Sequence, residues 1–354
     1  FTMLTTTHLI HYEDSRNLPF IADSSVDLVV TSPPYPMIEM WDGIFTKLNS
    51  SIGAAISSEN GRSAYELMHR ELDKVWMETA RVLKSGGWAC INIGDATRKI
   101  GGSFQLYSNH SRIISTFFAL GMECLPLILW RKQTNAPNKF MGSGMLPAGA
   151  YVTLEHEYIL VFRKGGKRVF AAPEEKERRR RSAIFWEERN TWFSDSWELK
   201  GARQALDGKS PRNRSGAYPF ELAYRLINMY SLQEDTVLDP FLGTGTTSLA
   251  AAASGRNSIG VEVDRELQSV IASTIDRAPE ISAARTAERF ADHKTLVEER
   301  EATKGPLKHS NTPHGMKVVT SQETGLVLPA VRSVARQTYE RYEIEYAKAE
   351  FLTD

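Results

Sequence analysis

A glycine-rich turn that follows a short apolar segment constrains the fold of this chain more than any other feature of its sequence. Val237-Leu238-Asp239 predicts a buried strand, and the glycines of Gly243-Thr244-Gly245 allow a tight turn with close approach of the backbone. A helix is predicted over residues 246–253, and the hydroxyls of Thr246 and Thr247 are predicted to cap it. The first amide groups of that helix would then face a bound polar ligand.

Glu262 lies near the end of the next predicted strand, residues 258–263, and gives the turn a chemical partner. A carboxylate at that position can accept hydrogen bonds from both hydroxyls of a ribose. The turn differs from a phosphate-binding loop because no Gly-Lys-Ser/Thr sequence follows, and its glycine spacing is not that of a dinucleotide-binding loop. A turn with a purely structural role is the alternative. Glu262 near the end of the following strand instead favours a turn that binds a ligand containing a nucleoside.

The rest of the chain alternates between predicted strands and predicted helices. The strands are expected at residues 26–30, 88–93, 125–130 and 158–162, and the helices at residues 64–83, 111–120, 219–230 and from 265 onward. This alternation predicts an α/β fold with a doubly wound, mostly parallel sheet. Residues 163–213 interrupt the pattern with basic and aromatic residues and are expected to form a small module. The charged extension, residues 278–354, has no chemical interpretation.

Composition excludes several classes of protein. Lys and Arg number 43, as do Asp and Glu, so the formal net charge is zero and any contact with nucleic acid needs a local basic patch. Cys90 and Cys124 offer neither a disulfide framework nor zinc-ligand spacing, and no metal site is expected. No segment reaches the roughly 20 apolar residues of a membrane helix, and Phe1-Thr2-Met3-Leu4 lacks a signal-peptide pattern. We expect a soluble, cytoplasmic protein.

The motif Ser32-Pro33-Pro34-Tyr35 follows the predicted strand at residues 26–30. Proline fixes φ and holds the preceding residue extended, so the Pro33 carbonyl and the Ser32 hydroxyl can both face one amine. The ring of Tyr35 can stack on a planar base. An amine conjugated to an aromatic ring is a poor nucleophile until such hydrogen bonds hold its nitrogen near tetrahedral geometry. A plain Pro-Pro turn is the alternative, and the glycine turn described above favours catalysis.

These motifs, in this order, resemble the beta-class amino-methyltransferases of DNA. In that family the first motif holds the target base and the second holds S-adenosylmethionine. The resemblance covers most of residues 11–275 and extends to the segments Arg81–Gly87, Asn92–Asp95, Leu129–Lys132 and Glu155–Phe162. It implies that the residues of the first motif, Ser32, Pro33, Pro34 and Tyr35, are catalytic. It implies a cofactor site made of Asp14, Tyr218, Pro219, Asp239, Phe241, Gly243, Gly245, Thr246 and Glu262. For Asp14, a helix-capping role is the alternative.

The resemblance also implies the reaction. Serine in the first position of the motif usually accompanies methylation of cytosine at N4, whereas Asp or Asn usually accompanies methylation of adenine at N6. We therefore expect a site-specific methyltransferase that acts on cytosine flipped out of duplex DNA, with adenine as the alternative. RNA or a glutamine side chain as substrate would be more usual with Asn in the first position. Carbon-5 methylation is disfavoured because neither cysteine follows a proline. The proton acceptor stays open, with water as one candidate.

The small module is where the family places its target-recognition region. Arg178, Arg179, Arg180, Arg181, Arg203 and Arg212 are therefore predicted to contact DNA. A solvated helix in which these arginines pair with neighbouring glutamates is the alternative. The expected division is a catalytic half at residues 1–162, the recognition region at 163–213, a cofactor-binding half at 214–277 and the extension at 278–354. Such enzymes act in restriction–modification systems, beside a restriction endonuclease that shares their site without stable contact. The oligomeric state stays open, with a homodimer as one possibility. A non-catalytic DNA-binding subunit that retains the fold is the alternative function.

Overall fold

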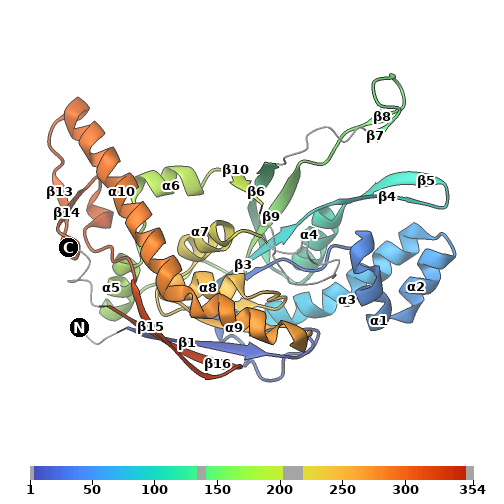
Figure 1. Cartoon of the computed structure of the whole chain (residues 1–354), viewed down its shortest axis with the longest axis horizontal. Coiled ribbons are helices and arrows are strands. Elements are labelled where there is room, and N and C mark those ends of the chain that lie inside the picture. Colours follow the sequence, from blue (N-terminus) through green and yellow to red (C-terminus); the bar gives the residue numbers. More distant parts are fainter. Residues whose placement is uncertain (1–3, 134–140, 202–217, 348–354) are drawn as a thin grey trace.

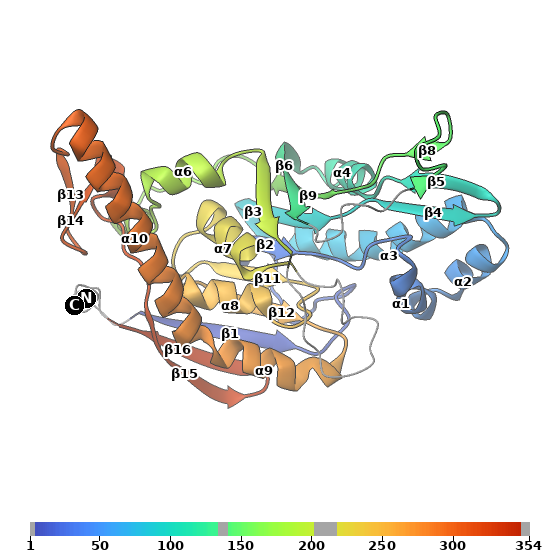
Figure 2. The same cartoon turned by 45° about the horizontal axis from the view of Figure 1, so that its top comes forward.

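The computed structural model describes residues 4–133, 141–201 and 218–347. Within these ranges ten strands form one sheet, in the order β10-β6-β9-β3-β2-β11-β12-β1-β16-β15 (Figures 1 and 2). Neighbouring strands run parallel from β3 through β2, β11 and β12 to β1, and antiparallel pairs flank this parallel centre. The prediction of an α/β fold with a mostly parallel central sheet is confirmed. The strands are β1 (Thr5–His11), β2 (Val26–Thr31), β3 (Leu83–Ile93), β6 (Glu123–Gln133), β9 (His156–Arg163), β10 (Ser196–Lys200), β11 (Thr236–Asp239), β12 (Asn257–Val261), β15 (Val331–Thr338) and β16 (Arg341–Tyr346).

Helices cover both faces of the sheet. On one face α3 (Gly61–Val82) and α4 (Asn109–Ala119) share a hydrophobic core with Val29. On the other face α7 (Phe220–Tyr230) and α8 (Thr246–Ala253) share a core with Leu28 and Val30. Successive residues of a strand point to opposite faces, and β2 is buried on both sides, so its sequence is apolar apart from Asp27 and Thr31. The other described elements are the helices α1 (Asp42–Leu48), α2 (Ser50–Ser57), α5 (Pro173–Arg181), α6 (Trp186–Trp192), α9 (Gln268–Asp276) and α10 (Ala278–Lys304), and the hairpin strands β4 (Ala96–Ile100), β5 (Ser103–Tyr107), β7 (Met141–Gly142), β8 (Ala150–Tyr151), β13 (His309–Asn311) and β14 (Met316–Val318).

The expected recognition module contributes directly to the main sheet. Its strand β10 pairs in parallel with β6, and Trp192 and Trp197 are buried in the same core as α7. This differs from the expectation of a separate module, because two of its tryptophans complete the core at this edge of the sheet. The rest of the module, from residue 202 to residue 213, lies outside the described residues.

The C-terminal extension closes the opposite edge of the sheet. Strand β16 pairs antiparallel with β1, and its inward residues Tyr342, Ile344 and Tyr346 are buried against α8 and α9. The long helix α10 packs beside α8 and β15 and carries β13 and β14 at its far end (Figure 1). One face of β16 therefore belongs to the hydrophobic core. In the described part of the chain no helix combines the length and apolarity needed to span a membrane.

Candidate active site

The glycine turn joins β11 to α8 as predicted. Gly243 and Gly245 both have positive φ, 57° and 91°, a region that L residues with side chains adopt only with strain. Gly245 itself is the N-cap of α8, and no side chain caps the helix. The prediction that Thr246 and Thr247 cap this helix is therefore wrong: they are its first two residues, and the Thr247 hydroxyl donates to Asp239 at 2.5 Å.

Hydrogen bonds to the carboxylate of Asp239 hold the glycine turn in place. This buried carboxylate accepts hydrogen bonds from the Thr31 hydroxyl at 2.6 Å, the Phe241 amide at 3.0 Å and the Tyr218 hydroxyl at 3.2 Å. Burial raises the pKa of Asp239, although these hydrogen bonds oppose the rise. Burial and the charge of Asp239 likewise raise the pKa of Tyr218. Asp239 and Tyr218 thus tie β2, the turn and the segment before α7 together. Neither residue lines the cavity described below, and Pro219 is the N-cap of α7.

Glu262 closes the turn from the side. It follows β12 directly, and its side chain accepts hydrogen bonds from the Gly243 amide at 2.9 Å and from the Asp264 amide at 2.8 Å. Glu262 is 9% exposed, and this exposed part faces a cavity. Each carboxylate oxygen has a second lone pair, so Glu262 can still accept from the hydroxyls of a ligand.

One cavity brings together residues from both predicted motifs. It lies at the carboxyl ends of β2, β11 and β12, where a doubly wound sheet binds its ligand. From the predicted site residues, the cavity is lined by Asp14, Ser32, Pro34, Phe241, Gly243 and Glu262. An apolar wall comes from α1 and α3 and includes Ile44, Phe45, Leu72 and Val75. The arrangement suits a ligand with an apolar, planar part and a polar part bearing hydroxyl groups.

Asp14 lines this cavity as half of an ion pair. Arg16 bridges the carboxylates of Asp14 and Glu71, with N–O distances of 2.7 and 2.6 Å. Burial opposes ionisation of Asp14, but hydrogen bonds from Arg16 outweigh it and hold its pKa below the usual value. A turn and not a helix follows Asp14, so the structure does not support the alternative role as a helix cap. Sequence patterns gave no sign of Arg16 or Glu71, because 55 residues separate the two partners.

A second cluster of motif residues lies beside the cavity, around the Tyr35 hydroxyl. This hydroxyl donates to Oε2 of Glu157 at 2.8 Å and lies 3.2 Å from Oγ of Ser32. Burial and the charge of Glu157 raise the pKa of Tyr35 well above its usual value. Nδ2 of Asn92 donates to both Tyr35 and Glu157, at 2.8 and 2.7 Å. Pro33 is buried, and Tyr35 is partly exposed beside Gly94, which leaves its predicted stacking on a base open.

The arginine run lies elsewhere. Arg178–Arg181 belong to α5, and their partners are, in order, the carboxylate of Asp235, the ring of Phe170, the carboxylate of Glu177 and the carboxylate of Glu234. Residues 234 and 235 immediately precede β11, so α5 lies at the amino ends of the strands, away from α1 (Figure 1). Helix α1 lines the cavity. This placement does not support the predicted DNA contact, because paired side chains at that end are remote from a base in the cavity. Arg203 and Arg212 lie outside the described residues.

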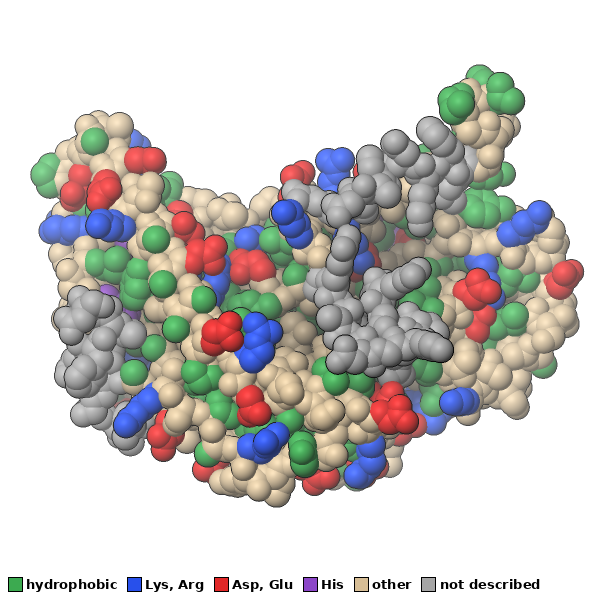
Figure 3. All heavy atoms as spheres, in the orientation of Figure 1, with side chains coloured by type: hydrophobic (Ala, Val, Ile, Leu, Met, Phe, Trp, Pro, Cys, Tyr) green, Lys and Arg blue, Asp and Glu red, His purple; other side chains and the backbone are tan. Residues whose placement is uncertain are grey.

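No basic area dominates the face drawn in Figure 3, where Lys and Arg side chains alternate with Asp and Glu side chains among the described residues. This mixture agrees with the formal net charge of zero.

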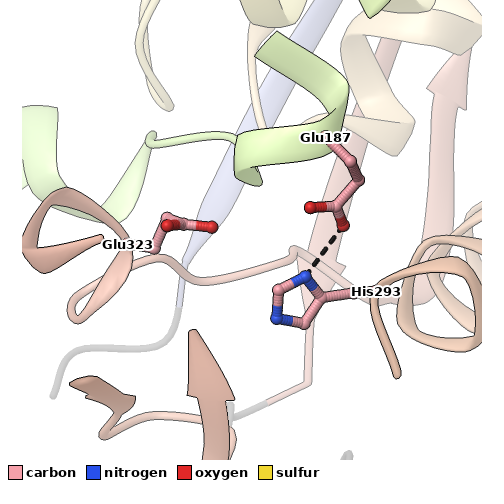
Figure 4. A group of neighbouring side chains, drawn as sticks. All are labelled: Glu187, His293 and Glu323. Carbon is pink, nitrogen blue, oxygen red and sulfur yellow. Dashed lines mark hydrogen bonds and ion pairs between the residues drawn. The ribbon is translucent and has the colours of Figure 1, made fainter. Parts of the chain in front are cut away.

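Glu187, His293 and Glu323 place three potential metal-ligating atoms within 4.8 Å of one another (Figure 4). Hydrogen bonds account for the histidine, because Nδ1 of His293 lies 2.8 Å from Glu187 and Nε2 lies 2.9 Å from the Lys317 carbonyl, which can only accept. Burial lowers the pKa of His293, but these hydrogen bonds outweigh it and raise the pKa overall. Glu323 accepts from the Thr320 amide and hydroxyl. We interpret the cluster as a clamp between α6 and α10.

Comparison with known proteins now identifies the family. Residues 26–273 match the family model for N6/N4 DNA methylases. The chain belongs to the N4/N6 DNA methylase family. This methylase is 51% identical to the Type II methyltransferase M.MthZI of Methanothermobacter thermautotrophicus, over 97% of this chain and 96% of that protein. It is 50% identical to the Type II methyltransferase M.MjaI of Methanocaldococcus jannaschii, over 77% of this chain and 92% of that protein.

A solved relative supports the same conclusion for the cofactor. The putative DNA modification methylase TTHA0409 of Thermus thermophilus, solved in complex with S-adenosylmethionine, is 32% identical, with a TM-score of 0.58 over 77% of this chain and 95% of that chain. The methylase is thus an S-adenosylmethionine-dependent DNA methyltransferase of a restriction–modification system. The cavity fits this cofactor chemically: Glu262 can accept from ribose hydroxyls, and Phe241 offers an aromatic ring to the adenine.

Proposed function

We propose that this methylase transfers the methyl group to the exocyclic N4 amine of a cytosine flipped out of duplex DNA. The observation that carries the proposal is Ser32, whose hydroxyl stands where β2 ends, on the wall of the cavity that Gly243 and Glu262 also line. Serine in the first position of this motif usually accompanies cytosine-N4 methylation in the family. Adenine N6 is the competing target.

The chain's own residues bind and orient the two substrates. Glu262 and Asp14 accept hydrogen bonds from hydroxyl and amine groups of the cofactor, and the apolar wall from α1 and α3 excludes water from the cavity. S-adenosylmethionine, when bound, supplies an electrophilic methyl group on a sulfonium sulfur. Ser32 accepts a hydrogen bond from the target amine, and the two prolines after it hold that acceptor in place. Positioning and exclusion of water account for catalysis in this scheme.

Product analysis tests the proposal. The protein is incubated with isotopically labelled S-adenosylmethionine and long duplex DNA of mixed sequence, the DNA is digested to nucleosides, and the labelled nucleoside is identified by mass spectrometry. Labelled N4-methylcytosine supports the proposal, and labelled N6-methyladenine overturns the base assignment. Ser32→Ala should lose the label, whereas Ser273→Ala, an exposed serine on α9, should keep it. Labelling by Ser32→Ala at the wild-type rate would remove the role of this serine.

We also propose that a restriction endonuclease with the same recognition sequence accompanies this methylase. DNA that the protein has methylated should then resist cleavage by endonucleases of one specificity while staying sensitive to others. The labelled sites, mapped by sequencing, should coincide with that specificity. Methylation spread over unrelated sequences would contradict a restriction–modification role.

A further inference from the structure

Three neighbouring strands contribute polar side chains to the cluster around the Tyr35 hydroxyl and Glu157. Asn92 comes from β3, Glu157 from β9 and Lys132 from β6, and β9 lies between the other two strands. Glu157 is buried, and its Oε1 forms an ion pair with the ammonium group of Lys132, which is one-third exposed. Its Oε2 receives the hydrogen bonds from Tyr35 and Asn92. Two successive hydrogen bonds thus connect the Ser32 hydroxyl, through Tyr35, to the buried carboxylate of Glu157. The binding scheme above gives this carboxylate no role.

The directions of these hydrogen bonds follow from what each atom can donate. A carboxylate oxygen only accepts, so the Tyr35 hydroxyl uses its one hydrogen on Glu157. The Ser32 hydroxyl, 3.2 Å from the Tyr35 oxygen, must then be the donor of that pair. Asn92 donates to the Tyr35 oxygen at 2.8 Å and reinforces this order. Asn92 also lies 3.5 Å from Oγ of Ser32 and donates to one of its lone pairs, so the other lone pair is left to accept a hydrogen bond from the target amine.

We propose that Glu157 is the terminal acceptor of the proton that the target amine loses, and that Ser32 and Tyr35 carry the proton to it. This inference rests on the function proposed above. The bond from nitrogen to the methyl carbon forms as the bond from that carbon to the sulfonium sulfur breaks, and the sulfur keeps the electron pair as a neutral thioether. The amine nitrogen becomes positively charged at this point.

As the nitrogen gains this charge, and within the same rate-determining step, the proton moves along the hydrogen bonds already aligned. The nitrogen gives its proton to Oγ of Ser32 while the proton of Ser32 passes to Tyr35 and the proton of Tyr35 passes to Glu157. The products are a neutral methylated amine, Ser32 and Tyr35 as before, and a carboxylic acid at Glu157. Glu157 returns its proton to water before the next turnover, which restores its ion pair with Lys132.

The chemistry of the acceptor suits the donor. A methylated aromatic amine that carries a positive charge is a strong acid, so the carboxylate of Glu157, which pairs with Lys132, is basic enough to accept its proton. The raised pKa of Tyr35, caused by burial and by the charge of Glu157, keeps its hydroxyl protonated at neutral pH. Tyr35 is therefore suited to pass a proton on and unsuited to keep one.

The test compares three variants by the rate of single-turnover methyl transfer. Tyr35→Phe keeps the ring for stacking and removes only the hydroxyl, and Glu157→Gln removes the acceptor. We expect each variant to lower the rate about 100-fold, and the double variant to lower it no further, since the two residues act in one path. Glu155→Gln and Tyr339→Phe, which alter exposed groups outside the path, are the matched controls and should keep the wild-type rate.

The pH profile separates a proton acceptor from a structural residue. The wild-type rate should fall at the acidic end of its pH profile, because a protonated acceptor cannot take up the proton, and Glu157→Gln should lose this acidic limb. Cofactor affinity, measured by calorimetry, should stay within about twofold in all variants. Tyr35→Phe also leaves the ion pair intact, so the test holds if Glu157→Gln does not fold.

Two results would overturn the inference in different ways. Wild-type methylation together with unchanged rates in Tyr35→Phe and Glu157→Gln removes the relay and leaves the proposed function standing. Wild-type protein that forms no methylated base removes the proposed function and the relay with it. A pH limb that persists in Glu157→Gln would assign the proton to another acceptor.

Discussion

At the carboxyl ends of β2, β11 and β12 polar groups face the cavity of the candidate active site, whereas at the amino ends of β2 and β11 the charged groups that line a second cavity pair with one another. At the first end, Ser32 and Glu262 line space that a substrate and cofactor can fill. At the second end, Asp27 pairs with Lys84 at 2.8 Å and Asp235 pairs with Arg168 at 2.7 Å. Charge at the amino ends is neutralised within the protein and stabilises the junction of strands and helices. The position of a charge relative to the sheet, more than its abundance in the sequence, therefore marks the site.

The largest expected effect comes from Pro34, which lines the cavity at the carboxyl end. Pro34→Ala frees the backbone that holds Ser32 and Tyr35, and displacement of a reacting group by about 1 Å can cost roughly 100-fold in rate. We expect single-turnover methylation to fall at least about 100-fold while the cofactor dissociation constant, measured by calorimetry, stays nearly unchanged. Pro19→Ala, in an exposed position before β2, is the control and should behave as wild type. A normal rate in Pro34→Ala would show that rigidity here is dispensable.

Replacing Glu262 tests the cofactor-binding part of the cavity at the carboxyl ends of the strands. Glu262→Ala removes a charged acceptor and the hydrogen bond to the Gly243 amide, and hydrogen bonds to charged groups contribute roughly 1.5–3 kcal/mol each. We expect the dissociation constant for S-adenosylmethionine to rise about 10- to 100-fold, as measured by calorimetry. Glu266→Ala, an exposed glutamate four residues away, should leave the constant unchanged. Equal affinity in the two variants would contradict a ribose-binding role.

Replacing Asp235 tests the amino ends of the strands, where we expect an effect on the free energy of unfolding. Asp235→Ala leaves Arg168 and Arg178 without their shared carboxylate, and loss of one partner of a largely buried pair is costly. We expect the free energy of unfolding to fall by about 2–3 kcal/mol, with the methylation rate per folded molecule unchanged. Urea titration measures the first quantity. Glu177→Ala, which removes an exposed carboxylate, should change stability by less than about 0.5 kcal/mol.

The sequence predicted the carboxyl end well because the signals there are local. The turn glycines, Glu262 and the Pro-Pro motif each follow a predicted strand, and parallel strands bring such segments to one edge. Contacts between segments far apart in the sequence could not be predicted in this way. Tyr35 and Glu157, for example, form a hydrogen bond although 122 residues separate them. Strand β1 was not predicted from the sequence, for another reason. Its buried face carries Thr6 and His8, which hydrogen-bond to each other at 2.9 Å, so its pattern lacks the apolar alternation that marks a strand.

The arginine run shows where charge patterns fail. Runs of arginine beside glutamate look alike on a helix that contacts DNA and on one that pairs with the protein. The distinction depends on which end of the sheet α5 packs against, and that is set by the fold. The family segments around Asn92, Lys132 and Glu157 were visible in the sequence, but only the order of β3, β9 and β6 brings Asn92 and Lys132 to the carboxylate of Glu157.

A smaller effect is expected from the clamp between α6 and α10, which belongs to neither end. The folded-state pKa of His293 is raised above its usual value of 6.5, so the protonated form stabilises the fold. This contribution is fully present below pH 6.5 and is lost as the pH rises through the folded-state pKa. We therefore expect the Tm difference between wild type and His293→Gln to shrink with rising pH. A difference that grows with pH would mean that His293 is neutral when folded.

The smallest expected effect concerns the exposed arginines of α5. Arg179 and Arg180 carry the two most exposed side chains of the run, and if they contacted phosphates each would release counterions on binding. Because α5 lies at the amino ends of the strands, we expect the double variant Arg179→Ala/Arg180→Ala to bind DNA with an unchanged dependence of log affinity on log salt concentration. The double variant Arg277→Ala/Lys294→Ala, with two other exposed basic residues, serves as the control. A slope smaller by about 2 in the first variant alone would place DNA along α5 and extend the binding surface to both ends of the sheet.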